Sequence, residues 1–335
     1  MKSALITGIT GMVGSHLTDY LLKNTKWNIY GLSRWRSPLD NVEHLLNRAN
    51  KKNSRVNFIY GDLNDYSSIV ECIEKSKPDY VFHLAAQSYP QTSFTEANLT
   101  LDTNIIGTYN LLNAINKSKY KPFVHVCSSS EIFGKVAKEK LPIDEDCSFH
   151  PASPYAISKV GTDLIGRYFF EAYNMKVMVT RMFTHTGPRR GDVFAESTFA
   201  KQIALIEAKK NSPIIKVGNL ESLRTFADVR DAVKAYYILL TKKPTPGQAY
   251  NIGGNFTCKI GDMLNYLISL SKVKNIKIIT DKSRLRPIDA DLQVPNTNKF
   301  QSHTGWKPKI KFEKTMLDLL SYWREKVKKN NFLDR

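Results

Sequence analysis

Tyr155 and Lys159 lie four residues apart in "SPYAISK", a spacing that places both side chains on one face of a helix. An ammonium beside a phenol lowers the phenol's pKa from its reference value of about 10, so Tyr155 can act as a base near neutral pH. The serine run from Ser128 to Ser130 ends an apolar segment farther upstream and can hold a substrate alcohol through a hydroxyl. Together these groups predict proton transfer to and from an alcohol.

Three glycines near the N-terminus have the spacing of a phosphate-binding turn. The segment "ITGITGMVGSHL" places Gly8, Gly11 and Gly14 after an apolar strand and at the start of an amphipathic helix. Glycine permits the tight turn and the close approach of the backbone to a pyrophosphate, whose charge rests on the helix N-terminus. We therefore expect a dinucleotide cofactor here, with Met12 and Val13 in the same turn, rather than a purely structural turn.

The end of the second expected strand indicates which dinucleotide is bound. An unphosphorylated ribose calls for an acidic residue there, but the chain reads "IYGLSRWRS". Arg34, Arg36 and Ser37 offer cations and a hydroxyl, which favour the 2′-phosphate of NADP over NAD. The alternative is that these arginines are solvated loop residues or subunit contacts. The ends of the next apolar segments add further candidates for cofactor binding, namely Asp62, Leu63, Leu84, Ala85 and Ala86.

Short apolar segments alternate with helical patterns through the first two thirds of the chain. Strands that read as almost continuous hydrophobic stretches are typical of a parallel sheet covered by helices on both faces. The pattern predicts an α/β fold with a Rossmann-type doubly wound parallel sheet and a smaller C-terminal substrate-binding lobe. We expect residues 1–180 to form the NADP-binding domain, with later strands returning to it, and residues 181–335 to bind mainly the substrate.

Composition excludes several classes of protein. The formal charge is +18 over 335 residues, but the lysines are spread along the chain rather than gathered in one stripe, so nucleic-acid binding is not expected. No apolar run approaches the roughly 18 to 20 residues of a membrane span, and the N-terminus does not resemble a secretory signal. The four cysteines lack a C-x-x-C pair, which argues against a metal site and fits free thiols in the cytoplasm.

The chain resembles the extended short-chain dehydrogenase/reductase family over nearly its whole length, and more narrowly the GDP-mannose 4,6-dehydratase branch of that family. The matching segments, in order, are "ALITGITGMVGSHL", "GLSRWRS", "GDLND", "HLAAQSYPQTSF", "TNIIGTYNLL", "CSSSEIFG", "SPYAISK", "GPRRGD", "VGNLESLRTFADVRDAV", "RPIDAD" and "TGWKP". The resemblance implies a homodimer or homotetramer and a GDP-sugar substrate.

The resemblance also gives a role to the glutamate behind the serines. It implies that Tyr155, assisted by Ser129, removes the proton of the sugar 4-hydroxyl during oxidation at carbon 4. Glu131 then takes the proton from carbon 5 while water leaves carbon 6, giving a 4-keto-6-deoxy sugar. The structural alternative is that Glu131 caps a helix or pairs with a lysine of "GKVAKEK".

Residues of the second half are assigned by the same resemblance. His185 matches a histidine near the nicotinamide, and Arg190 could reach either the cofactor or a subunit partner. Thr184 stands where the family commonly has a sugar-facing Asn, which leaves mannose and a manno-heptose both open. The implied substrate contacts are Ser88, Ser130, Thr184, Lys201, Asn219, Arg224, Arg286 and Asp289, of which Lys201 could instead face solvent.

Two competing functions remain at this point. A carbon-4 dehydrogenase, reductase or epimerase of a GDP-sugar would use Tyr155 and Lys159 but not Glu131. A non-catalytic dinucleotide sensor would need neither, and the presence of the pair counts against it.

Overall fold

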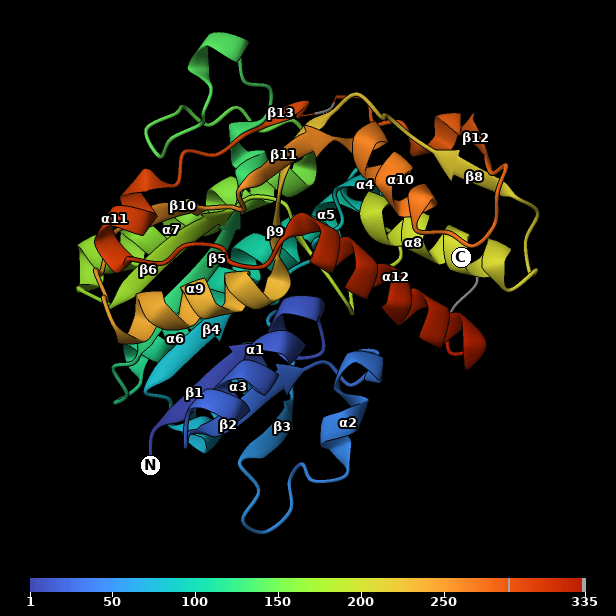
Figure 1. The fold of residues 1–335 in the computed structure, drawn as a ribbon. Helices are drawn as coiled ribbons and strands as arrows, with labels where there is room; N and C mark the ends of the chain where they lie inside the picture. Colours follow the sequence, from blue (N-terminus) through green and yellow to red (C-terminus); the bar gives the residue numbers. More distant parts are fainter. Residues whose placement is uncertain (289, 333–335) are drawn as a thin grey trace.

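The structure is a computed structural model of the chain, and it describes residues 1–288 and 290–332. Seven strands form one sheet in the order β10, β6, β5, β4, β1, β2, β3, and each neighbouring pair is parallel (Figure 1). In chain order the strands are β1 (Ser3–Thr7), β2 (Asn28–Ser33), β3 (Val56–Tyr60), β4 (Tyr80–His83), β5 (Phe123–Ser129), β6 (Val177–Met182) and β10 (Ala249–Ile252). The predicted doubly wound parallel sheet is confirmed.

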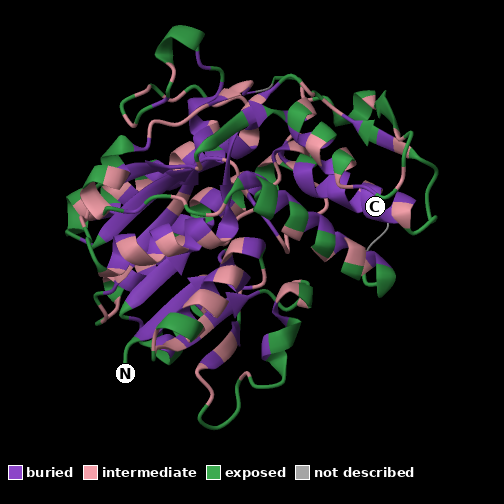
Figure 2. Ribbon diagram, in the orientation of Figure 1, coloured by how far each residue is buried: buried purple, intermediate pink, exposed green. Residues whose placement is uncertain are grey.

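Helices cover both faces of this sheet. Side chains alternate along β1, so that Ala4 and Ile6 join one buried cluster and Leu5 joins the other. The first cluster includes α1 (Met12–Asn24) and α9 (Val229–Thr241), which lie together on one face (Figure 1). The second cluster includes α3 (Tyr66–Ser76), α6 (Gly107–Lys117) and α7 (Pro154–Tyr173). Figure 2 shows the sheet strands buried between helices whose outer sides are partly exposed.

A third buried cluster belongs to the second half of the chain. It packs α8 (Ala195–Glu207), α10 (Ile260–Ser269) and α12 (Phe312–Lys328) against strands of two small sheets. One small sheet pairs β8 (Ile214–Val217) with β12 (Lys277–Thr280). The other centres on β9 (Leu223–Asp228), with β7 (His185–Thr186), β11 (Phe256–Lys259) and β13 (Leu292–Gln293). The chain crosses back to the large sheet at β10, so its two parts are interleaved.

Short elements complete the described chain. They are α2 (Glu43–Leu46), α4 (Pro90–Ser93), α5 (Ala97–Leu101), α11 (Asn298–Thr304), the π-helix η2 (Asp102–Ile106) and the 3-10 turns η1 (Asp40–Val42), η3 (Ser130–Phe133), η4 (Lys138–Lys140) and η5 (Lys282–Arg284). Within the described residues, no helix combines the length and the apolar character needed to cross a bilayer.

Helix α7 begins and ends at residues suited to those positions. Ser153 accepts a hydrogen bond from the Ala156 backbone N–H at 3.0 Å, and Pro154 occupies the first turn, where it removes no helical hydrogen bond. Asn174 ends the helix with φ 50°, a left-handed conformation that asparagine tolerates. This start point carries Tyr155 and Lys159 on the first turns of α7, next to the end of β5.

His16 makes folding stability depend on pH. Its ring Nε2 on α1 donates to the Pro188 carbonyl at 3.0 Å, and burial together with the nearby Arg189 lowers its pKa to about 4. The unfolded chain therefore binds a proton near pH 6.5 that the folded chain excludes, so stability falls as pH drops from 7 toward 4.

We expect His16→Gln to reduce this pH sensitivity, because glutamine can donate to the same carbonyl without titrating. The loss of unfolding free energy between pH 7 and pH 5 should shrink by about 1 to 2 kcal/mol relative to the parent, measured by urea unfolding. An equal loss in both proteins would contradict the assignment, since the other buried histidines are present in each.

Candidate active site

A cavity of about 1130 Å³ opens at the carboxyl ends of the large sheet's strands. Its walls come from the turn after β1, the ends of β2, β4, β5 and β6, and the segments around α8, β9 and α12. Because parallel strands all point the same way, their ends meet at one edge, where α/β proteins bind ligands.

The glycine turn has the shape that a pyrophosphate requires. Gly8 adopts φ +73°, and its carbonyl accepts the Gly11 N–H at 3.0 Å. A Cβ on Gly14 would lie 2.3 Å from the Gly8 carbonyl oxygen, so only glycine lets α1 approach the turn this closely. Helix α1 starts here without a side-chain cap, leaving backbone N–H groups directed at the cavity. Gly8, Gly11, Met12, Val13 and Gly14 all line it, so the residues present fit a dinucleotide.

The end of β2 offers hydroxyls and one arginine to the cavity. The Ser33 hydroxyl is buried and has no hydrogen-bond partner among the described residues. Arg34 and Ser37 line the same cavity, whereas Arg36 is exposed and lies outside the cavity wall. Of the two predicted arginines, the structure thus brings only Arg34 to the site.

The remaining predicted cofactor residues line the cavity. They are Asp62, Leu63, Leu84, Ala85, Ala86, His185 and Arg190. Burial and the charge of Arg190 lower the pKa of His185 to about 4, so this ring is neutral near pH 7. Its Nδ1 is 3.1 Å from the Phe183 carbonyl, which fixes the ring's orientation.

Tyr155 and Lys159 are both buried and both line the cavity. The Lys159 ammonium donates to the Cys127 carbonyl at 2.7 Å, and burial lowers the pKa of that ammonium. The Ser128 hydroxyl donates to the Lys159 carbonyl at 3.1 Å. The start of α7 is therefore tied to the end of β5, next to the serine run.

The prediction that neighbouring side chains of the protein lower the Tyr155 pKa is wrong. Burial raises the pKa of Tyr155 well above its usual value, and a hydrogen bond with Ser129 offsets this only in part. The negative charge of Glu131 raises the pKa further, while the nearby Arg190 lowers it. Desolvation of the phenolate outweighs the Ser129 hydrogen bond and the Arg190 charge, so Tyr155 needs additional positive charge nearby to act as a base.

Glu131 faces the same cavity from the turn that follows β5. Its backbone N–H donates to the Ser129 hydroxyl at 3.2 Å, which caps η3. Its carboxylate lies 3.7 Å from the Arg286 guanidinium. Among the described residues, the ion-pair partner of Glu131 is this arginine and not a lysine of residues 134–140, so the lysine alternative is wrong.

The substrate-side candidates divide into three groups. Ser88, Ser130, Thr184, Asn219, Arg224 and Arg286 all line the cavity. Lys201 is buried rather than solvent-facing, and it forms an ion pair with Asp192 at 3.1 Å from behind the cavity wall. Arg224 is also buried and donates to the Ala290 carbonyl. Asp289 lies outside the described residues.

Comparison with known proteins identifies the family. A family model described as GDP-mannose 4,6 dehydratase matches residues 5–319. This chain belongs to the GDP-mannose 4,6-dehydratase family. The predicted branch of the extended short-chain dehydrogenase/reductases is thereby confirmed.

Relatives within and beside the dehydratase family cover almost the whole chain. The chain is 30% identical to a GDP-mannose 4,6 dehydratase of Drosophila melanogaster, over 98% of this chain and 88% of that protein. It is also 30% identical to the GDP-6-deoxy-D-mannose reductase of Pseudomonas aeruginosa, over 96% and 97%. A solved structure of RMD from Pseudomonas aeruginosa, complexed with NADPH, superimposes with a TM-score of 0.81 at 28% identity, covering 97% of this chain and all of that one.

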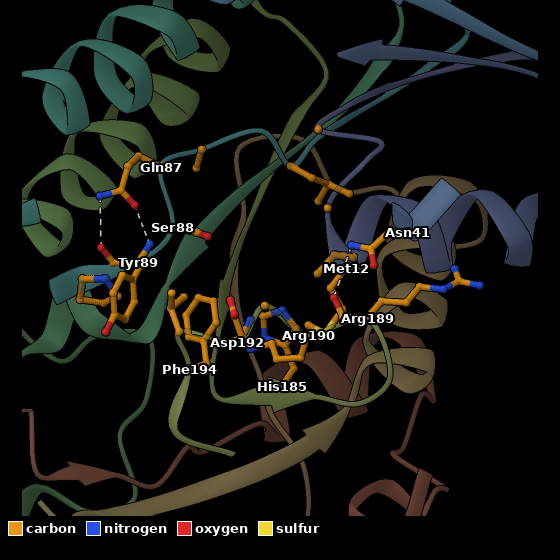
Figure 3. A pocket seen from close by; sticks show the side chains of 18 of the residues that line it. Met12, Asn41, Gln87, Ser88, Tyr89, His185, Arg189, Arg190, Asp192 and Phe194 are labelled. Atoms are coloured by element: carbon orange, nitrogen blue, oxygen red, sulfur yellow. Dashed lines mark hydrogen bonds between the residues drawn. The ribbon is translucent and has the colours of Figure 1, made fainter. Parts of the chain in front are cut away.

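Sequence reasoning missed an aromatic contact across the cavity. The rings of Tyr89 and Phe194 meet edge to face at 5.6 Å, and the Arg190 guanidinium lies 3.4 Å from the Phe194 ring centre (Figure 3). The Gln87 side chain holds Tyr89 by accepting its backbone N–H at 2.6 Å and donating to its carbonyl at 3.1 Å. Tyr89 lies within the family-matching segment "HLAAQSYPQTSF", and Phe194 lies two residues after "GPRRGD". Their contact joins residues too far apart in the sequence for local patterns to detect.

The glycine turn yields a direct prediction for cofactor binding in this family member. Gly14→Ala should weaken NADPH binding at least about tenfold, because the added methyl must displace the Gly8 carbonyl. NADPH fluorescence titration measures the affinity, and circular dichroism checks that the protein remains folded.

The matched control is Gly261→Ala, where a Cβ would lie 3.4 Å from the Leu220 carbonyl, an ordinary contact. Parental NADPH affinity in folded Gly14→Ala protein would contradict the role of the turn.

Proposed function

We propose that this protein is an NADP-dependent 4,6-dehydratase that converts a GDP-mannose-type sugar, hexose or manno-heptose, to its 4-keto-6-deoxy form. The observation that carries the proposal is the position of Glu131, which lines the same cavity as Tyr155 and whose backbone N–H donates to the Ser129 hydroxyl two residues upstream. A simple carbon-4 reductase requires the tyrosine and lysine but has no use for a second base. The family match over residues 5–319 points the same way.

Side chains of the protein accept and donate the protons in this reaction. Tyr155 accepts the proton of the sugar 4-hydroxyl, and Ser129 orients that hydroxyl from the end of β5. When bound, NADP would supply the hydride acceptor for oxidation at carbon 4, the hydride donor for reduction at carbon 6, and the positive charge of its oxidised ring. Glu131 then takes the proton from carbon 5, which the neighbouring ketone has made acidic, and donates it to the carbon-6 hydroxyl, which leaves as water. Lys159 and Arg190 provide the cations that stabilise negative charge at Tyr155.

NADP fits the end of β2 better than NAD does. Arg34 can pair with a 2′-phosphate, and the hydroxyls of Ser33 and Ser37 can donate to it. An acidic residue that would accept from an unphosphorylated ribose is missing from "GLSRWRS". The solved structure of RMD from P. aeruginosa, complexed with NADPH, supports the same cofactor. Arg36 is not part of this proposed set, because it lies outside the cavity wall.

The nucleotide end of the substrate is assigned to the basic wall from the second half of the chain. Arg224 and Arg286 suit diphosphate oxygens, since a guanidinium fork matches their geometry. Asn219 contributes an amide beside them, and Lys201 acts through Asp192 rather than by direct contact. The remaining candidates, Ser88, Ser130 and Thr184, are assigned as contacts to the sugar. We accordingly propose that residues 1–180 bind mainly the cofactor and residues 181–335 mainly the substrate.

The catalytic prediction concerns Glu131→Gln. This change should lower the rate of water loss by about 10² to 10⁴, because a positioned proton transfer is removed, while oxidation at carbon 4 is spared. Mass spectrometry after incubation with NADP and either GDP-mannose or GDP-manno-heptose gives both the product and the preferred sugar. The parent should release a product lighter by one water without net cofactor reduction.

Glu139→Gln is the matched control, because this exposed glutamate lies in η4, farther along the loop that follows Glu131. It should leave the rate unchanged. If the parent accumulates reduced cofactor and a 4-keto sugar with all oxygens retained, the protein is a carbon-4 dehydrogenase and the dehydratase proposal fails.

We also propose that the protein is a cytoplasmic homo-oligomer, either dimer or tetramer. All four cysteines are free thiols, which suits a reducing compartment. Exposed apolar side chains gather on the neighbouring helices α6 and α7, including Tyr109, Ile157, Leu164 and Tyr168. Ile157, Leu164 and Tyr168 follow helical spacing along one stripe, and such a stripe is suited to a second copy of the chain.

Leu164→Glu should therefore convert the oligomer to a monomer, because it introduces a charge at the centre of the stripe, which the second copy would bury. Analytical ultracentrifugation measures the change. Leu317→Glu, at an equally exposed leucine on α12, should retain the parental mass. A monomeric parent protein would contradict self-association.

A further inference from the structure

Two segments from opposite ends of the chain meet at the rim of the cavity. The Lys326 ammonium on α12 donates to the Asp40 carboxylate at 2.6 Å, across 286 residues of sequence. Only 15% of the Lys326 side chain is exposed, and its ammonium lies 5.6 Å from the centre of the Tyr322 ring. Burial lowers the pKa of Lys326, but Asp40 and Tyr322 together raise it more, so the ammonium stays charged.

The segment that carries Asp40 is also anchored to the phosphate-binding turn. The Asn41 side-chain amide donates to the Thr10 carbonyl at 3.1 Å. It also donates to the Arg189 carbonyl at 3.4 Å (Figure 3). The Arg189 guanidinium in turn contacts Asp19 on α1 at 2.8 Å. Asp40 and Asn41, which follow β2, therefore contact the glycine turn before α1, the loop before α8, and α12.

The residues of these contacts line the cavity that is proposed to hold the cofactor. Asp40, Asn41, Arg189, Tyr322 and Lys326 line the same cavity as the glycine turn. Opening the Asp40–Lys326 contact would separate the segment after β2 from α12 at this rim. The contact joins the part of the chain proposed to bind the cofactor to the part proposed to bind the sugar.

We propose that Asp40 and Lys326 form a latch that slows the release of NADP(H). The inference rests on the proposed function, because a hydride taken and returned within one turnover does not require the cofactor to leave. A reductase must exchange its cofactor after each turnover and gains nothing from such retention. Asp40 and Lys326 are thus positioning residues that act on cofactor exchange rather than on the reacting atoms.

A second explanation for Lys326 makes a different prediction. If the Lys326 ammonium bound the 2′-phosphate directly, loss of Lys326 would weaken the binding of NADPH and leave the binding of NADH unaffected. Loss of Asp40 would then free the ammonium to bind NADPH more tightly. A latch that closes the rim retains both nucleotides and depends equally on both partners.

The test is the rate of cofactor release, measured by stopped-flow displacement of NADPH and, separately, NADH from the full-length protein. Asp40→Lys and Lys326→Asp should each accelerate the release of both nucleotides by about fivefold, as expected for loss of one partly exposed ion pair. The double variant restores opposite charges and should return to within about twofold of the parent. Lys314→Gln, which removes an exposed pair with Asp318 on the same helix, is the control and should have no effect.

Three outcomes would overturn the latch: unchanged release in both single variants, acceleration without rescue by the charge swap, or an effect confined to NADPH and Lys326→Asp. Where a charge reversal prevents folding, Asp40→Asn and Lys326→Gln replace it with the same expected direction. The assay contains no sugar, so its result is independent of whether GDP-mannose is dehydrated. Failure of the latch and failure of the dehydratase proposal are therefore separable.

Discussion

Parallel pairing of the seven strands in the large sheet is the constraint on which the site depends. Because all the strands point the same way, the turn after β1 and the ends of β2, β4, β5 and β6 reach one edge. The glycine turn lies at this edge, and so do Ser129 and Tyr155. Helices on both faces bury the sheet, which holds these ends in a fixed relation. A change in strand order would disperse the same residues.

Burial at this edge has a cost for the chemistry proposed there. Tyr155 and Lys159 are both removed from water, which raises the pKa of the phenol and lowers that of the ammonium, so each group favours its neutral form. The protein offsets part of this with the Ser129 hydroxyl and the Arg190 charge. In the proposed mechanism, positive charge brought by bound ligands would lower the Tyr155 pKa and so favour proton removal in the filled cavity.

The second half of the chain also meets the first half through charged contacts at and near the cavity. Arg286 meets Glu131, Arg189 meets Asp19, and Lys326 meets Asp40. Ion pairs that are partly exposed contribute little individually to stability, so they can break and re-form without unfolding either part. One apolar cluster joins α1 to α9 across both parts of the chain and another packs α8, α10 and α12 together, while these ion pairs add polar contacts between the two parts.

The sequence by itself determined the features that depend on local spacing. Gly8, Gly11 and Gly14 indicated the turn, Tyr155 and Lys159 indicated a shared helix face, and the apolar runs indicated a parallel sheet, since each signal lies within a few neighbouring residues. Only the tertiary structure decided that Arg36 lies outside the cavity, that Lys201 lies behind Asp192, and that the Tyr155 pKa rises rather than falls. Burial and long-range pairing control these properties, and both depend on segments that are distant in sequence and meet only after folding.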